Sequence, residues 1–470
     1  MKHFISTGLL FFLICGTVIS QTKTAVIESP ALYLNSFQKF THDELNADSA
    51  FYYVKKLASN NQYEPLLKNL LHNSFVQIFI RKDFEGEIDS NKINIRNKQL
   101  SLSKAILSRI EADTIYLLKE IAKPIILWTK IQDNTNNISL LTTLTNEFIT
   151  QHLTPSKFYT NRTGRYGLLI HKIISEQSDL KSLASEMFNY IKDNLQSNQK
   201  TVLESTTRAE LDKRAWYRYL YAFVSNHESS IVIDTFQKQI LLKTAFDFSP
   251  DLTDKNRQSA YFYDMYLLGG KETFEDDYLN FLVKNTSDKK QVLQTLLKMA
   301  LTEPNHKEKL SNFYTENDDT GVPFLDFWIN SIENKAEPSP TVSAIQIDKK
   351  IFSSEALHGK WVLIDFWGTW CSPCREEHPD LQKFYTQLIL QNSSKISLLT
   401  IACNDTEEKV VKYMKEKGYS FPVAMSDGNF ETDFKVQSYP TKILITPKGK
   451  FITVPFDIDW ASFIKKYSNL

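Results

Sequence analysis

Cysteine is scarce in this chain of 470 residues, with four in all, at positions 15, 371, 374 and 403. Small exported domains that depend on disulfides for their stability contain many more, so the sequence excludes that class. Two of the four, Cys371 and Cys374, stand three residues apart. A pair this close, in a chain that otherwise avoids cysteine, indicates chemistry more than structural cross-linking.

An excess of charge is also absent, because Lys plus Arg and Asp plus Glu number 55 each. Without a basic surplus the chain has no general attraction for phosphate backbones, so we expect no nucleic-acid partner. Disorder is not expected either, since 42% of the residues are hydrophobic and 13% are aromatic, which suffices for packed cores. The length predicts two or three domains.

Long apolar runs are missing except at the N-terminus, where Lys2 and His3 precede an apolar run over residues 4–19. This run is short for a membrane-spanning helix, which needs about 20 apolar residues. Its basic start, apolar centre and polar end predict a signal peptide over residues 1–20. We therefore expect an exported protein of the periplasm or cell envelope, with an N-terminal membrane anchor as the alternative.

Glycine is rare over residues 24–333, with six in that stretch. Apolar residues recur there at helical spacing, for example at Leu180, Leu183 and Met187, which places them on one face of a helix. Residues 21–333 are therefore predicted to form a large, mainly α-helical domain of unknown function.

Three local features refine this prediction. Prolines at positions 124, 155, 250 and 304 are expected to separate helices, because proline cannot donate the hydrogen bond that a helix interior needs. Around Gly86, β-branched residues alternate within residues 75–95, which predicts a β-hairpin. Two prolines among polar residues predict a linker over residues 334–343.

Sheet-forming patterns appear after the predicted linker. Residues 361–364 are a continuous apolar run and residues 396–402 form a second apolar segment, as is typical of buried central strands. Helical patterns follow both, a hairpin is expected around Gly449, and a helix closes the chain. This alternation predicts an α/β domain over residues 344–470.

The cysteine pair lies in the stretch DFWGTWCSPCREEHP, residues 365–379. Structural zinc usually needs four Cys or His ligands, and one pair stands here, so zinc is not expected. Covalent haem attachment needs a histidine directly after the second cysteine, and that position is Arg375. A redox-active dithiol is the interpretation that remains.

The dithiol interpretation fits the local pattern. Cys371 stands where a helix is expected to begin, and there unpaired backbone N–H groups and the helix dipole lower the pKa of a thiol. Cys374 lies about one turn further on, within reach of a disulfide bond. Cys371 is therefore predicted to attack a disulfide of a partner, and Cys374 to resolve the mixed disulfide.

Together with SYPTKILITPKG, residues 438–449, this stretch resembles the thioredoxin-fold thiol–disulfide oxidoreductases, and in particular the exported TlpA/ResA-like branch. The resemblance covers about residues 341–470. It implies an α/β thioredoxin-like C-terminal domain preceded by the large, mainly α-helical domain. It also implies that the cysteine pair works without a further cofactor or metal.

The resemblance assigns roles to five more residues. Pro440 would be a cis-proline that faces the dithiol, with Trp370 and Tyr439 beside it as substrate-binding residues. Asp365 and Glu377 are two candidates for the group that takes the proton of the resolving thiol, because a buried carboxyl has a raised pKa. The residues leave open which of the two does so.

The sequence thus predicts an exported thiol–disulfide oxidoreductase that reduces or exchanges disulfides of envelope proteins through a Cys-Ser-Pro-Cys dithiol. An exported reductant needs a source of electrons, so a membrane electron donor is implied. Cys403 is interpreted as a small apolar residue at the end of a strand. The alternative function is a helical binding or scaffold protein that carries a thioredoxin-like docking module.

Overall fold

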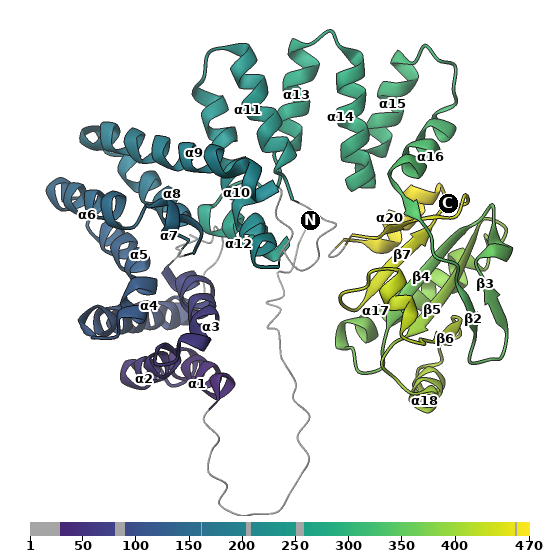
Figure 1. Cartoon of the computed structure of the whole chain (residues 1–470), viewed down its shortest axis with the longest axis horizontal. Helices are drawn as coiled ribbons and strands as arrows, with labels where there is room; N and C mark the ends of the chain where they lie inside the picture. Colours follow the sequence, from purple (N-terminus) through teal and green to yellow (C-terminus); the bar gives the residue numbers. More distant parts are fainter. Residues whose placement is uncertain (1–28, 80–89, 161, 204–207, 251–257, 456–457) are drawn as a thin grey trace, which may run out of the picture. The chain divides into compact units, whose positions relative to one another are not determined.

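Between Pro30 and Lys335 the described residues are mainly helical, and a mixed sheet follows them (Figure 1). The computed structural model describes residues 29–79, 90–160, 162–203, 208–250, 258–455 and 458–470. The predicted signal peptide lies outside these residues. By contact the chain divides into two compact units, residues 1–130 and 131–470, which are described in turn.

The first unit is helical throughout its described part. Its elements are α1 (Pro30–His42), α2 (Ala47–Ala58), η1 (Asn61–Tyr63), α3 (Glu64–Asn69), η2 (Leu70–Phe75), η3 (Val76–Phe79), α4 (Ser90–Ala112) and most of α5 (Tyr116–Asp133). Helices α1 and α2 pack against one another, and α4 packs on α2.

Two predictions in this unit are wrong. The hairpin over residues 75–95 is replaced by helix wherever the segment is described, since residues 76–79 belong to η3 and residues 90–95 to α4; residues 80–89 lie outside the described part. The reason is burial of Phe75, Val76 and Phe79, whose spacing fits one helical face, and such packing overrides strand propensity. Pro124 lies inside α5 and does not end it.

The second unit begins with a succession of helices. They are α6 (Ile138–Gln151), α7 (Pro155–Thr160), α8 (Thr163–Ser175), η4 (Ser178–Leu180), α9 (Lys181–Leu203), α10 (Arg208–Ile231), α11 (Thr235–Asp247), α12 (Gln258–Leu268), α13 (Glu275–Asn285), α14 (Lys289–Thr302), η5 (Pro304–His306), α15 (Lys307–Asn317) and α16 (Phe324–Lys335). From α13 to α16 each helix packs on the next, so Figure 1 shows them as a row.

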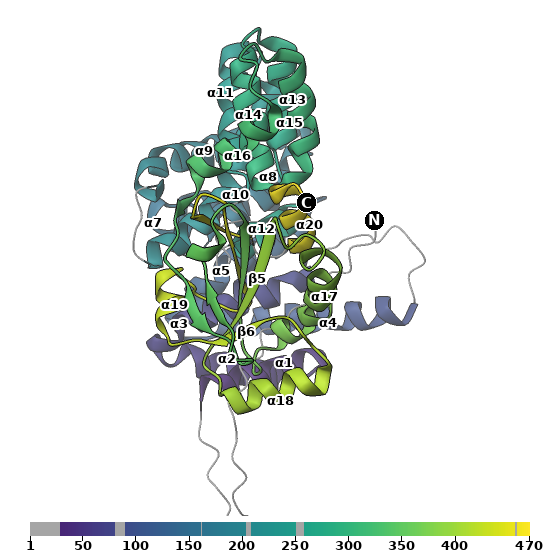
Figure 2. The ribbon, with the colours of Figure 1, turned by 90° about the vertical axis from the view of Figure 1, so that its right-hand side faces the viewer.

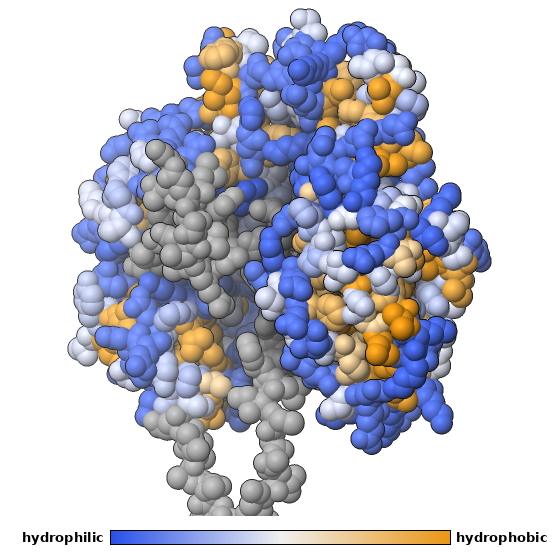
Figure 3. All heavy atoms as spheres, turned by 45° about the vertical axis from the view of Figure 1, so that its right-hand side comes forward, coloured by the Kyte–Doolittle hydropathy of each residue, from blue (hydrophilic) through white to orange (hydrophobic). Residues whose placement is uncertain are grey.

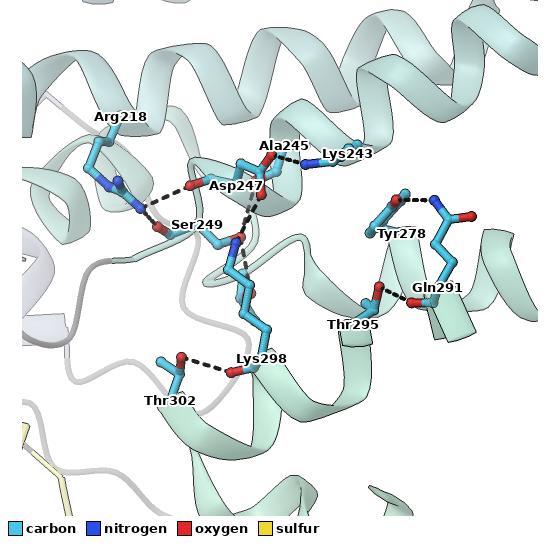
Figure 4. Close-up of polar contacts among 11 residues, drawn as sticks. Arg218, Lys243, Ala245, Asp247, Ser249, Tyr278, Gln291, Thr295, Lys298 and Thr302 are labelled. Atoms are coloured by element: carbon cyan, nitrogen blue, oxygen red, sulfur yellow. Dashed lines mark hydrogen bonds and ion pairs between the residues drawn. The ribbon is translucent and has the colours of Figure 1, made fainter. Parts of the chain in front are cut away.

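Polar contacts connect α10, α11 and α14 (Figure 4). Arg218 on α10 donates to the carbonyl oxygens of Asp247 and Ser249 at the end of α11. The carboxylate of Asp247 forms ion pairs with Lys243 and, at 2.9 Å, with Lys298 on α14. Three helices are therefore joined at the C-terminal end of α11, where carbonyl groups need partners.

Six strands then form one sheet in the order β1-β8-β7-β4-β5-β6. They are β1 (Glu337–Pro338), β4 (Trp361–Trp367), β5 (Ile396–Ala402), β6 (Val423–Met425), β7 (Thr441–Ile445) and β8 (Lys450–Thr453), with β2 (Ser343–Ile345) and β3 (Ile351–Ser353) as a separate ribbon. Strand β4 is buried along its whole length, between parallel β5 and antiparallel β7.

Helices cover both faces of the sheet. They are α17 (Ser372–Phe384), α18 (Glu407–Lys417), α19 (Asn429–Asp433) and α20 (Trp460–Ser468), with the short turns η6 (Glu355–Leu357) and η7 (Tyr385–Ile389). Because side chains alternate along a strand, Leu363 and Trp367 pack with α17, α18 and α20, while Ile364 and Phe366 pack with α19. Figure 2 shows α17 and α19 on opposite sides of the sheet. The predicted α/β C-terminal domain after a mainly helical region is thus confirmed.

The predicted linker, residues 334–343, is not a separate spacer. Helix α16 ends at Lys335 and β1 directly pairs with β8 at the sheet edge. One apolar core continues from α16 into the sheet domain, with Trp328 and Tyr467 as members. For this reason the boundary between compact units falls at residue 130 and not near residue 334.

Apolar side chains are distributed in patches on the surface. Figure 3 shows hydrophilic residues over most of the visible face, with apolar residues among them. In the described part of the chain, no helix is both long enough and apolar enough to span a bilayer.

Candidate functional site: the cysteine pair and its surroundings

The cysteine pair stands where helix α17 begins. The buried strand β4 ends at Trp367, and a short loop leads to Cys371, which is the N-cap residue of α17. Its sulfur accepts the backbone N–H of Cys374 at 3.3 Å, which satisfies one of the unpaired donors of the first turn. Pro373 occupies that same turn, where its missing N–H costs nothing. The predicted position of Cys371 at a helix start is confirmed.

The two sulfurs are bonded to one another. The Cα atoms of Cys371 and Cys374 are 5.4 Å apart, a normal separation for a disulfide. Both residues are buried, with 4% and 1% of their surface exposed. The structure therefore shows the oxidised form of the pair, at a site where a thiolate formed on reduction faces backbone N–H groups.

Asp365 and Glu377 are brought together by a third residue. Asp365 on β4 is 1% exposed, and the side chain of Glu377 on α17 is 36% exposed. The Nζ atom of Lys442 on β7 lies 3.1 Å from Oδ1 of Asp365 and 2.5 Å from Oε2 of Glu377. We call these three residues the charge cluster.

Lys442 was missed by the sequence reasoning. The signal that could have found it is a single lysine within the apolar strand TKILI, two residues after Pro440, because buried lysines are rare without partners. Burial lowers the pKa of Lys442, whereas Asp365 and Glu377 raise it, and the carboxylates prevail so that the pKa is raised. The ammonium form is therefore the stable one.

Two of the residues expected to bind substrate, Trp370 and Tyr439, contact one another. The Tyr439–Pro440 peptide bond is cis, as predicted. The rings of Trp370 and Tyr439 contact each other edge to face at 5.3 Å, and Trp370 is 52% exposed. An added Cβ on Gly368 would lie 2.5 Å from Nε1 of Trp370, so glycine is needed for this tryptophan to fold over the loop.

Cys403 follows β5 as a buried residue with a free thiol. Its sulfur donates to the carbonyl oxygen of Ile401 at 3.4 Å, and its own carbonyl accepts the Nε1–H of Trp370. Burial, with Glu431 nearby, raises the pKa of the thiol well above its usual value. A thiol held protonated is a poor nucleophile, which agrees with the interpretation of Cys403 as a small apolar residue.

His378 is a second buried group close to the cluster. It packs edge to face on Trp367, with ring centroids 4.5 Å apart, and its Nδ1 lies 3.0 Å from the hydroxyl of Tyr413. Burial, and then the charge of Lys442, lowers the pKa of His378 to about 3. The imidazole is therefore neutral at physiological pH. Within the described ranges, no group of three or more His, Cys, Asp or Glu side chains is arranged to hold a metal ion.

Known proteins resemble this domain. Residues 336–453 match the model of the AhpC/TSA family. The thiol-disulfide oxidoreductase ResA of Bacillus subtilis is 33% identical over 115 residues, which is 24% of this chain and 63% of that protein. The thioredoxin-like protein YneN of the same organism is 30% identical over 120 residues, 24% of this chain and 67% of that protein.

A solved structure also matches. The crystal structure of a thiol:disulfide interchange protein of the thioredoxin family from Chlorobium tepidum has 29% sequence identity and a TM-score of 0.25, covering 28% of this chain and 95% of that one. The chain spans less than two thirds of the length of the ResA proteins it matches. On the strength of the sequence relatives and of the cysteine pair at the start of α17, the chain belongs to the thioredoxin-like family through its C-terminal domain.

Proposed function

We propose that this chain is an exported thiol–disulfide oxidoreductase that reduces or exchanges disulfides of envelope proteins through Cys371 and Cys374. The observation that carries the proposal is the position of Cys371 at the N-cap of α17, where its sulfur accepts the N–H of Cys374 and is bonded to the sulfur of that residue. The match of residues 336–453 to the AhpC/TSA family and the likeness to a thiol-disulfide oxidoreductase over 115 residues support the same reaction.

The reaction begins from the reduced pair. The Cys371 thiolate attacks one sulfur of a substrate disulfide, and the other substrate sulfur leaves as a thiolate. A mixed disulfide then joins Cys371 to the substrate. Cys374 loses its proton and attacks the sulfur of Cys371, which releases the second substrate thiolate. Two electrons pass to the substrate, and the protein is left with the disulfide of the structure.

The other site residues have supporting roles in this proposal. Asp365 and Glu377 are candidates for the acceptor of the Cys374 proton, since Lys442 holds both in the charge cluster, Asp365 on β4 and Glu377 on α17. The exposed ring of Trp370, in contact with Tyr439, offers an apolar surface for the substrate chain, and Pro440, which follows Tyr439, is the third residue proposed to bind substrate.

The cell compartment and the partners belong to the same proposal. The pattern of residues 1–20 supports export, with an N-terminal anchor as the alternative. Substrates would be disulfide-containing proteins of the envelope, and nucleic acid is not a partner. A protein that reduces disulfides must itself be reduced again, so the proposal includes a membrane electron donor.

Reduction of insulin disulfides by the full chain, with dithiothreitol as donor, tests the activity. The wild type should accelerate insulin precipitation, and Cys371→Ser should return the rate to that of dithiothreitol alone because the attacking sulfur is gone. Cys403→Ser, at a buried thiol, is the matched control and should retain the activity. Equal rates for Cys371→Ser and the wild type would instead favour the helical scaffold with a docking module.

A further inference from the structure

The charge cluster places charged side chains at buried positions where apolar residues would pack equally well. Asp365 and Lys442 are direct cross-strand partners on β4 and β7, and both are buried, with 1% and 6% exposed. Their neighbours on these strands, Leu363 and Leu444, are apolar and fully buried. Replacement of a buried ion pair by apolar residues is often neutral or stabilising, so stability alone does not explain a lysine at this position.

The pairing register of β4 and β7 determines which face of the sheet the Lys442 side chain occupies. A shift of one residue in the β4–β7 register would turn its side chain to the opposite face. An ammonium group has three N–H donors. On this face of the sheet, two carboxylates lie within 3.1 Å of Nζ of Lys442, and the ring centroid of Trp460 on α20 lies 4.9 Å from it. The ammonium is thus enclosed by β4, α17 and α20.

The cluster lies on the same side of the sheet as the cysteine pair. Asp365 points to the face of Leu363 and Trp367, which share one apolar core with Cys371 and Cys374. Glu377 is one helical turn beyond Cys374 on α17. The charged groups that face Lys442 are therefore Asp365 from β4 and Glu377 from α17, with neutral His378 also on α17.

In the cluster one ammonium faces two carboxyl groups. A nearby positive charge favours the ionised form of a carboxyl group, so an ammonium held between the two favours a carboxylate that can accept a proton. Without the ammonium, the two carboxyl groups would lie next to one another, and each would favour protonation of the other. Glu377 is the member with solvent access, since 36% of its side chain is exposed compared with 2% for Asp365.

We propose that Lys442 is a positioning residue of the dithiol reaction, which keeps Asp365 and Glu377 free to accept the Cys374 proton during resolution of the mixed disulfide. This inference rests on the proposed function. In the step concerned, the S–H bond of Cys374 breaks and its proton passes to a carboxylate of the cluster. The new thiolate forms the bond to the sulfur of Cys371, the mixed disulfide breaks, and the substrate sulfur leaves with the electron pair. The proton then reaches solvent through Glu377.

A two-phase reaction separates this step from the first attack. The full chain with Cys15→Ala and Cys403→Ala retains two of its four cysteines. After reduction, it is mixed with 5,5′-dithiobis(2-nitrobenzoate). Attack by Cys371 releases one thionitrobenzoate, and resolution by Cys374 releases the second, so stopped-flow absorbance reports both rates from about pH 5 to 9.

Lys442→Met should slow the second phase and leave the first phase unchanged. A lost opposite charge in direct contact shifts a pKa by about one unit or more. We therefore expect the pH midpoint of the second phase to rise by about one unit, with a rate about tenfold lower on its acidic side. Lys442→Arg, which keeps the charge, should lie closer to the wild type. Lys450→Met, on neighbouring β8, is the matched control and should change neither phase.

The inference is overturned when Lys442→Met leaves the rate and midpoint of the second phase unaltered, or when Lys442→Arg shifts them as far as methionine does. If Lys442→Met does not fold, as judged by circular dichroism, Glu377→Gln at the half-exposed position replaces it and should also slow the second phase about tenfold. An unchanged second phase in that variant equally contradicts the inference. Failure of the proposed function would be recognised differently. In that case the protein with Lys442 intact would itself not show two successive phases of thionitrobenzoate release.

Discussion

At the scale of single residues, burial decides which groups near the dithiol carry charge. Lys442 is buried beside two carboxylates and remains an ammonium, with its pKa raised. His378 is buried among aromatic rings beside that ammonium, and its pKa is lowered to about 3. At neutral pH the lysine is therefore charged and the histidine is neutral. The difference arises because Lys442 lies next to carboxylates, whereas His378 lies among aromatic rings near a positive charge.

His378 should make the domain sensitive to acid. A histidine has a pKa near 6.5 in the unfolded chain, so below that pH the unfolded state gains a proton that the folded state takes up only near pH 3. The contribution of the neutral His378 to the free energy of unfolding is therefore fully present above pH 6.5 and decreases as the pH falls towards 3. At pH 5 the free energy of unfolding should be lower by about 2 kcal/mol. Urea unfolding at pH 7.5 and pH 5 should show this loss in the wild type, and His378→Phe should abolish it.

Tyr413→Phe is the control for that experiment, because it removes the hydroxyl next to Nδ1 of His378 and keeps the imidazole. It should retain the full difference between the two pH values. An equal acid sensitivity of His378→Phe and the wild type would show that other groups cause it.

At the scale of elements, the junction between α16 and α20 joins the helical row to the sheet domain. Trp328 on α16 is fully buried, its Nε1 donates to the carbonyl oxygen of Tyr467 at 3.0 Å, and the two rings meet at 5.4 Å. The hydroxyl of Tyr467 in turn donates to the carbonyl oxygen of Leu301 on α14 at 3.0 Å. The last helix of the sheet domain is therefore part of the core of the helices that precede it.

Trp328→Ala should destabilise both parts at once. Removal of a large buried aromatic side chain costs about 3–5 kcal/mol, and we expect a loss in this range in urea unfolding of the full chain. Trp328→Phe, which keeps a ring at the contact but loses the hydrogen bond, should cost clearly less. A loss below about 1 kcal/mol for the alanine variant would mean that the junction does not couple the two parts.

At the scale of the whole molecule, the dithiol belongs to a much longer chain than the matched domain, which covers residues 336–453 of 470. The helices from α6 to α16 lie in the same compact unit as the sheet. Partner choice is therefore a property to test on the full chain, and not on the sheet domain alone.

Cys374→Ala in the full chain should accumulate mixed disulfides with natural partners, because Cys371 can attack but nothing resolves the product. Non-reducing gels and mass spectrometry of envelope extracts would identify these partners. We expect the captured proteins to be exported proteins that contain disulfides. The double variant Cys371→Ala/Cys374→Ala is the control and should capture none. If Cys374→Ala formed no mixed disulfide with any protein of the extract, this result would argue against the enzymatic proposal.

Local patterns were sufficient where one short segment contains the determining information. The cysteine spacing, the apolar run of β4 and the helix start at Cys371 were predictable from their own neighbours, and the cis bond before Pro440 followed from the family resemblance. The same kind of reasoning was wrong for residues 75–79 and 90–95, the described parts of the predicted hairpin, and for Pro124. There the packing of distant residues outweighed propensity.

The sequence by itself therefore determined the α/β class of the C-terminal domain, the redox pair and the helical nature of the rest. Only the tertiary structure decided that Lys442 meets Asp365 and Glu377, residues 77 and 65 positions away in the chain, and that Trp328 packs on Tyr467. The physical reason is that hydrophobic periodicity and helix capping are local, whereas strand register and the partner of a buried charge depend on which distant segments the fold places side by side.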